Sequence, residues 1–133
     1  MNILLVEDNR SDAELLTELL SETGKAPVVH WVADGAEALK FLQRKEGYSD
    51  AVRPDLVLLD LGLPRVNGYE VLRTVRNRPE LATLMIYVLT TSQNPADRSE
   101  CETVGADAFI SKPRNLKEYD MLVEKIVSGD IAD

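Results

Sequence analysis

The chain has 133 residues, of which 44% are hydrophobic and 29% are charged, and its formal net charge at pH 7 is −8. These values are typical of one globular domain and exclude an intrinsically disordered chain. The acidic balance argues against binding to the phosphate backbone of nucleic acids or to an anionic membrane surface, because both need a basic face.

Five short apolar runs, rich in valine, isoleucine and leucine, follow one another along the chain. They are Ile3–Val6, Val28–Val32, Leu56–Leu59, Met85–Leu89 and Ala108–Ile110. Most of them do not alternate with polar residues, which is the pattern of strands that are covered on both faces of a parallel sheet. We therefore predict five parallel β-strands.

Segments with helical spacing lie between these runs, and their starts carry capping signatures. In four of them an oxygen-bearing cap is followed three residues later by an acid: Ser11 and Glu14, Asp34 and Glu37, Asn67 and Glu70, and Asn115 and Glu118. The remaining start has Asn94 before Pro95, and proline suits the first helical position. Alternating strands and helices with right-handed crossovers predict an α/β fold, an open parallel sheet with helices on both faces.

The sequence also bears on where the protein acts. The longest fully apolar run, Leu84–Leu89, is far too short to span a bilayer, and Ile3–Val6 is too short for the apolar part of a signal peptide. Cys101 is the sole cysteine and has no internal partner for a disulfide. We expect a cytoplasmic protein with neither a membrane nor a nucleic acid as its partner.

Three carboxylates are predicted at one edge of the sheet, where the functional crevice of such folds lies. Glu7 and Asp8 follow the first strand, and Asp60 follows the third. A hard divalent cation with oxygen ligands would offset their mutual repulsion, and Mg²⁺ is the usual choice where phosphate is also handled. Each acid by itself is better explained as a loop cap or a surface group, so the metal site is favoured only by the matched positions of all three.

The fourth and fifth strands end in a hydroxyl and a cation, at Thr90 and Lys112. Lys112 could neutralise a phosphoryl oxygen as a point charge, and the Thr90 hydroxyl could donate to one. Each alone is better explained as a solvated lysine or a strand-end residue bonded to backbone. Together with the three acids, Thr90 and Lys112 indicate a site that binds or transfers a phosphoryl group.

With this set of residues the sequence resembles the receiver domain of two-component response regulators, from Asn2 to about Ser128. The motifs are Glu7-Asp8, Leu59-Asp60-Leu61-Gly62-Leu63-Pro64 followed by Gly68, Thr90, and Ser111-Lys112-Pro113. The resemblance implies a flavodoxin-like, doubly wound (βα)5 fold with strand order 2-1-3-4-5. It also implies a single receiver domain over residues 1–133, with a core of about 2–128 and no output domain, so that the signal leaves by protein–protein contact.

The resemblance assigns roles to the site residues. Asp60 is the expected phosphoacceptor, which takes a phosphoryl group from the phosphohistidine of a histidine kinase, and Lys112 is expected to contact that group. Asp8 would bind Mg²⁺ directly and Glu7 through water. Asp60 and the backbone carbonyl of Gly62 would complete the metal ligands. Such a protein is a signalling protein, catalysing only its own phosphorylation and dephosphorylation.

Thr90 and Phe109 resemble the switch pair of the family, in which the threonine moves toward the phosphate and an aromatic ring turns inward. The surface that changes is formed by the fourth helix, fifth strand and fifth helix. The Lys112–Pro113 bond is expected to be cis, as is typical of the family. The sequence departs from the commonest pattern in two places: Gly62 has no side chain to shield the acyl phosphate, and Phe109 lacks the hydroxyl of the more frequent tyrosine.

Within the family the chain is most similar to short, stand-alone regulators of phytochrome-type histidine kinases. The similarity rests on Asn9-Arg10-Ser11-Asp12, Gly47–Pro54, Pro64–Gly68 and Leu89–Ser92. It implies a sensor histidine kinase of the bacteriophytochrome type as partner and a homodimer through the last helices. Tyr119, Met121 and Leu122 on the last predicted helix are expected to be core or dimer surface.

Three other functions fit the sequence less well. A phosphohydrolase of the haloacid dehalogenase type needs Asp-x-Asp, and here Gly62 stands where the second acid would be. A nucleotide-binding protein would need a glycine-rich phosphate loop, and neither G-x-G-x-x-G nor G-x-x-x-x-G-K-[ST] occurs among the seven glycines. A pseudo-receiver, an interaction module with a dead site, is disfavoured by the intact set of acids, Thr90 and Lys112.

Overall fold

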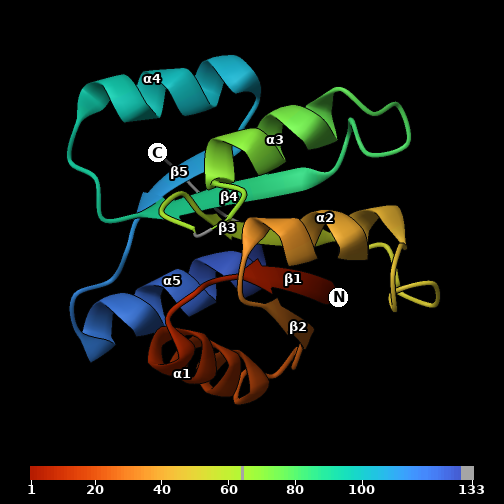
Figure 1. The fold of residues 1–133 in the computed structure, drawn as a ribbon. Helices are drawn as coiled ribbons and strands as arrows, with labels where there is room; N and C mark the ends of the chain where they lie inside the picture. Colours follow the sequence, from red (N-terminus) through yellow and green to blue (C-terminus); the bar gives the residue numbers. More distant parts are fainter. Residues whose placement is uncertain (64, 130–133) are drawn as a thin grey trace.

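The computed structural model describes residues 1–63 and 65–129. Pro64 of the predicted phosphoacceptor motif and the last four residues of the predicted domain lie outside the described residues. Within them, strands and helices alternate strictly (Figure 1). In chain order they are β1 (Asn2–Val6), α1 (Arg10–Ser21), β2 (Val28–Val32), α2 (Gly35–Gln43), β3 (Leu56–Asp60), α3 (Gly68–Arg76), β4 (Met85–Thr90), α4 (Pro95–Val104), β5 (Ala108–Ser111) and α5 (Leu116–Ser128).

The strands form one parallel sheet in the order β2-β1-β3-β4-β5, which confirms the predicted fold class and strand order. Every predicted strand exists, and its predicted bounds differ from the observed ones by at most one residue at either end. The extra carboxyl-terminal residues are Asp60, Thr90 and Ser111, so these polar side chains belong to the strands themselves. The sheet ladder therefore fixes their backbone positions.

The helices cover both faces of the sheet, with α1 and α5 on one face and α2, α3 and α4 on the other (Figure 1). Side chains alternate between the two faces along each strand. In β1, Ile3 and Leu5 pack in the layer of α1 and α5, whereas Leu4 and Val6 pack in the layer of α2 and α3. Because both faces are buried, the strands read as continuous apolar runs.

Four of the predicted helix caps are confirmed, and one is wrong. The side chains of the confirmed caps each accept a backbone N–H of the first turn: Asp34, Asn67, Asn94 and Asn115. For α1 the sequence favoured Ser11, but the cap is Asn9, whose side chain accepts the N–H of Asp12 at 3.0 Å. The connection from β1 is short, so the helix begins at Arg10 and Ser11 lies inside its first turn.

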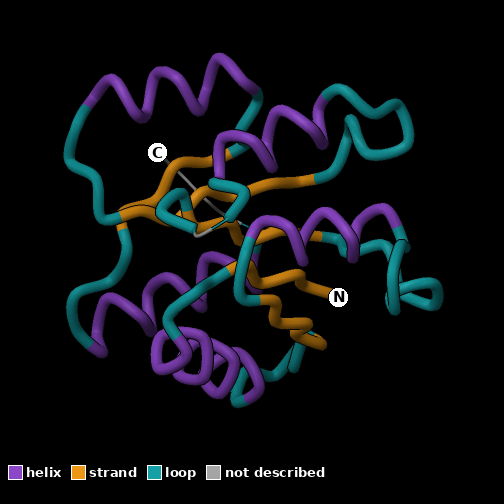
Figure 2. The backbone as a smooth tube through the Cα atoms, in the orientation of Figure 1, coloured by secondary structure: helices purple, strands orange, loops and turns teal. Residues whose placement is uncertain are grey.

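The long connection after α2, the loop at the lower right of Figure 2, is tied by hydrogen bonds to that helix. The Tyr48 hydroxyl donates to Oε2 of Glu37 at 2.7 Å, and Arg44 Nε donates to the carbonyl of Ala51 at 2.9 Å. In the described part of the chain, no helix is both long and apolar enough to cross a membrane.

At the amino edge of the sheet, Arg76 ties the end of α3 to the starts of two strands. Its Nη2 pairs with Oδ2 of Asp107 at 2.9 Å, and its Nε and Nη1 donate to the carbonyls of Gly105 (2.9 Å) and Leu84 (2.6 Å). Oδ2 of Asp107 also accepts the N–H of Ile86 at 2.9 Å. Arg76 therefore has one carboxylate partner and several carbonyl acceptors.

Candidate functional site

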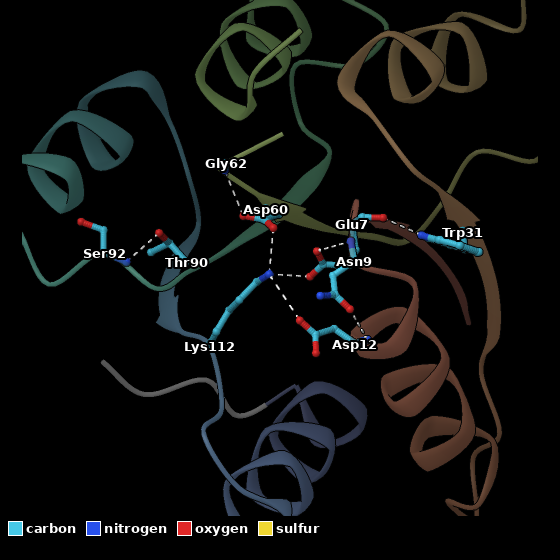
Figure 3. A network of polar contacts seen from close by, with 9 residues as sticks. All are labelled: Glu7, Asn9, Asp12, Trp31, Asp60, Gly62, Thr90, Ser92 and Lys112. Atoms are coloured by element: carbon cyan, nitrogen blue, oxygen red, sulfur yellow. Dashed lines mark hydrogen bonds and ion pairs between the residues drawn. The ribbon is translucent and has the colours of Figure 1, made fainter. Parts of the chain in front are cut away.

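The carboxyl ends of β1, β3, β4 and β5 meet at one edge of the sheet and bring the predicted site residues together (Figure 3). The register places Val6 beside Leu59 and Asp60 beside Leu89. Thr90 pairs with Ser111, the residue before Lys112. Parallel pairing puts all four strand ends on the same side, as the sequence analysis expected.

Carboxylate oxygens of Glu7, Asp8 and Asp60 lie within 4.8 Å of one another. Glu7 and Asp60 are buried, and Asp8 is exposed at the mouth of the site. Hard oxygen donors at this spacing fit a hard divalent cation such as Mg²⁺ or Mn²⁺. The predicted clustering of the three acids is thus confirmed.

Lys112 reaches into the middle of this cluster (Figure 3). Its Nζ lies 2.6 Å from Oε1 of Glu7, 2.8 Å from Oδ2 of Asp60 and 3.9 Å from Oδ2 of Asp12. Asp12, in the first turn of α1, was not identified from the sequence as a site residue. Only packing of the strand ends brings it close to Lys112, 100 residues later in the chain.

The expectation of a cis Lys112–Pro113 bond is wrong, because no peptide bond between described residues is cis. The backbone N–H of Lys112 donates to the carbonyl of Thr90 at 2.8 Å, which continues the β4–β5 ladder by one residue. This hydrogen bond aims Lys112 at Asp60 with a trans bond.

The close contacts shift the pKa of two groups in the site. Burial raises the pKa of Glu7 to about 7, and nearby Asp60 adds to this, while Lys112 and the N–H of Asn9 act against it. Burial alone would lower the pKa of Lys112, but its bonds to Asp60 and Glu7 outweigh burial and hold that pKa above its usual value. Lys112 therefore stays charged, and the acids around it outnumber it.

Three hydrogen bonds fix the acid pair after β1. The N–H of Glu7 donates to the carbonyl of Val32 at 3.1 Å, and the indole Nε1 of Trp31 donates to the carbonyl of Glu7 at 2.7 Å. The N–H of Asn9 donates to Oε2 of Glu7 at 3.1 Å. No periodic signal in the sequence links Trp31 to Glu7. Because the Glu7 carbonyl shares a peptide plane with Asp8, the indole helps to orient Asp8.

The backbone around Asp60 depends on two glycines for different reasons. The N–H of Gly62 donates to Oδ1 of Asp60 at 3.0 Å, and a Cβ at Gly62 would make an ordinary 3.8 Å contact with that oxygen. A side chain would therefore fit at Gly62, and its absence leaves Asp60 less shielded. At Gly68, a Cβ would lie 2.6 Å from the backbone oxygen of Asp60, so only glycine lets α3 begin this close to β3.

The residues of the predicted switch pair lie on the neighbouring strands β4 and β5. Thr90 is buried at the end of β4, and its Oγ1 accepts the N–H of Ser92 at 3.0 Å. Phe109 is half-buried in β5 and packs under α4 against the cluster of Leu61, Val88 and Cys101.

Burial distinguishes the residues of interest on α4 and α5. Cys101 is fully buried, and burial raises the pKa of its thiol to about 11, in line with an unreactive residue. On α5, Leu122 belongs to the core, whereas the side chain of Met121 is exposed. Leu116, the first residue of α5, is exposed.

Comparison with known proteins agrees with this geometry. The family model described as response regulator receiver domain matches residues 3–124. Response regulator Rcp1 from Synechocystis sp. is 37% identical over 126 residues, covering 95% of this chain and 86% of Rcp1. The Mn²⁺-bound structure of Rcp1 is similar with a TM-score of 0.89 at 37% identity, covering 96% of this chain and 91% of the other. The phosphorylated cyanobacterial phytochrome response regulator RcpA has a TM-score of 0.89 at 38% identity, with coverages of 94% and 89%.

Proposed function

The chain belongs to the response regulator receiver family, and on this basis we propose that Asp60 is its phosphoacceptor and a histidine kinase phosphohistidine the donor. One observation carries the proposal: Lys112 and the N–H of Gly62 each hold one oxygen of the Asp60 carboxylate. This carboxylate also adjoins the two acids after β1. The Asp60 carboxylate is thus oriented, and it lies beside a cation and beside two further carboxylates.

The proposed transfer is an in-line displacement at phosphorus. An oxygen of Asp60 forms the new P–O bond while the P–N bond of the phosphohistidine breaks, and the electron pair leaves with the imidazole. Such a transfer needs positioning and neutralisation of charge more than bond-making help from side chains. Lys112, already 2.8 Å from Oδ2 of Asp60, is placed to hold an equatorial phosphoryl oxygen.

We assign a Mg²⁺ site to the same edge of the sheet. Asp8 would bind the metal directly, Glu7 through water, and Asp60 and the carbonyl of Gly62 would complete the protein ligands. The metal would neutralise charge on the phosphoryl oxygens during transfer. The spacing of the three carboxylates supports the site, as does the Mn²⁺-bound form of the relative Rcp1.

We propose that phosphorylation is read out by Thr90 and Phe109, which would change the surface of α4, β5 and α5. The similarity to RcpA supports a histidine kinase of the phytochrome type as partner, in the cytoplasm where ATP supplies the phosphoryl group. The exposed Met121 on α5 fits a homodimer through the last helices. A phosphotransfer panel with purified kinases would identify the partner by preferential labelling.

The direct test is intact-mass measurement after incubation with Mg²⁺ and acetyl phosphate. The wild type should gain one phosphoryl group, Asp60→Asn none, and Asp50→Asn, a control at an exposed aspartate, should gain one as before. Absence of the adduct from the wild type would reject Asp60 as phosphoacceptor, and so would an equal adduct on Asp60→Asn. Lys112→Ala should retain Mg²⁺ binding but lose phosphorylation-dependent partner binding.

A further inference from the structure

We propose that Tyr69 is a positioning residue of the switch, whose hydroxyl acts through Asp97 and Ser92 to hold Thr90 and the start of α4. In this way an α3 hydroxyl contributes a polar link that Phe109 cannot make. The proposal rests on the function assigned above, because it concerns how Thr90 is released when Asp60 is phosphorylated.

A continuous chain of hydrogen bonds runs from α3 to the end of β4. The Tyr69 hydroxyl donates to Oδ1 of Asp97 at 3.0 Å, and the Ser92 hydroxyl donates to Oδ2 of the same carboxylate. The backbone N–H of Ser92 in turn donates to Oγ1 of Thr90 at 3.0 Å (Figure 3). Every link is a direct contact, so a movement of Thr90 must disturb the chain.

The same chain of hydrogen bonds also holds the first turn of α4. Oγ of Ser92 accepts the N–H of Asn94, the residue that caps α4, at 3.2 Å. Asp97 lies in the first turn of that helix, where its negative charge is favourable. The position of α4 is thereby linked to the position of Thr90.

Tyr69 is well placed to anchor this chain. Its ring packs under α4 with Phe109 against Leu61, Val88 and Cys101. Burial and the bond to Asp97 raise the pKa of Tyr69 above its usual value, so the hydroxyl keeps its proton and remains a donor. Tyr69 and Phe109 share one apolar cluster, but only Tyr69 makes a hydrogen bond out of it to α4.

This chain of hydrogen bonds favours the unphosphorylated arrangement, in which Asp60 is a free carboxylate paired with Lys112. In the proposed switch Thr90 moves toward a phosphoryl group on Asp60, and this movement lengthens the hydrogen bond that its Oγ1 accepts from the N–H of Ser92. Removing the Tyr69 hydroxyl weakens the restraint on this movement. A hydrogen bond to a charged group corresponds to about a tenfold change in an equilibrium constant.

The test compares Tyr69→Phe with Tyr48→Phe under acetyl phosphate and Mg²⁺. Tyr48 is a matched control, because its hydroxyl also donates to a carboxylate, at 2.7 Å, in the loop after α2. We expect Tyr69→Phe to take up the phosphoryl group about three- to tenfold faster than the wild type. Amide hydrogens in the first turn of α4 should also exchange faster in that variant. Tyr48→Phe should match the wild type in both measurements.

Failure of this proposal is distinguishable from failure of the proposed function. A wild type that takes up no phosphoryl group overturns the function itself. A labelled wild type with an unchanged or slower Tyr69→Phe overturns only the role of Tyr69.

A second variant breaks the same chain of hydrogen bonds between Asp97 and Ser92. Ser92→Ala should accelerate uptake by a similar factor, and the double variant with Tyr69→Phe should be no faster than the faster single variant, because both remove one linkage. Rate factors that multiply in the double variant would show two independent effects and overturn the proposed chain.

Discussion

Two half-buried cations, Lys112 and Arg76, occupy opposite edges of the sheet, and their surroundings differ in one respect. The side chains of Lys112 and Arg76 are equally covered, with 15% and 16% exposed. Arg76 at the amino edge pairs with Asp107, and backbone carbonyls take its other donors. Lys112 at the carboxyl edge contacts two buried carboxylates and lies near that of Asp12.

This difference separates a structural clamp from a functional site. An ion pair with matched charges and satisfied donors, such as Arg76 with Asp107, holds elements in place but leaves no unpaired charge for a ligand to bind. At the carboxyl edge the acids outnumber the cation, and the repulsion that remains can be relieved by a divalent metal. The surplus of negative charge destabilises this edge of the sheet when no metal is bound. The same surplus lets the edge bind the divalent metal that phosphoryl transfer needs.

The largest effect is expected at the clamp. Arg76→Met removes the cationic partner of Asp107 and the donor to three backbone carbonyls, so the free energy of unfolding should fall by about 2–4 kcal/mol, as measured by urea denaturation. The loss should be the same in EDTA and in MgCl₂, because the clamp is remote from the metal site. If Mg²⁺ restored the free energy of unfolding of Arg76→Met, the two edges of the sheet would be energetically coupled.

The metal should stabilise the carboxyl edge. For the wild type, each tenfold rise in Mg²⁺ above its dissociation constant should add about 1.4 kcal/mol to the free energy of unfolding. Thermal unfolding across a MgCl₂ series, with NaCl at matched ionic strength as the control, measures this. An equal shift in NaCl would mean general screening and no specific site.

A smaller and opposite effect is expected for Asp8→Asn. Asp8 adds repulsion to Glu7 and Asp60 in metal-free buffer, so the variant should be more stable than the wild type there by about 1 kcal/mol. The same variant should lose the stabilisation by Mg²⁺. Asp50→Asn, an exposed control remote from the cluster, should show neither change. A destabilised Asp8→Asn in EDTA would contradict the surplus of negative charge.

The smallest effect is expected for Trp31→Phe, which removes the indole donor from the Glu7 carbonyl. The loss of one hydrogen bond should weaken Mg²⁺ binding by about three- to tenfold, because Asp8 is less well oriented. Titration calorimetry against the wild type measures the affinity. An unchanged affinity for Mg²⁺ would show that the Trp31 hydrogen bond serves the packing of β2 and not metal binding.

Local patterns in the sequence were sufficient for the elements and for the acidic cluster. Strands buried on both faces must be apolar throughout, and Asp60, Thr90 and Lys112 are found directly at the ends of such runs. Three capping pairs and Asn94-Pro95 also marked the helix starts correctly. The error at Ser11 arose because Asn9 offers the same kind of cap two residues earlier, and the sequence contains no distance that chooses between them.

By itself, therefore, the sequence determined the doubly wound fold and the identity of the residues that meet at its carboxyl edge. Only the tertiary structure decided that Asp12 lies near Lys112, that Trp31 holds the peptide before Asp8, and that Tyr69 is linked to Thr90. These contacts join residues on different elements through side-chain direction and packing. Periodicity cannot encode them, because it records which face a residue occupies and not which partner it meets there.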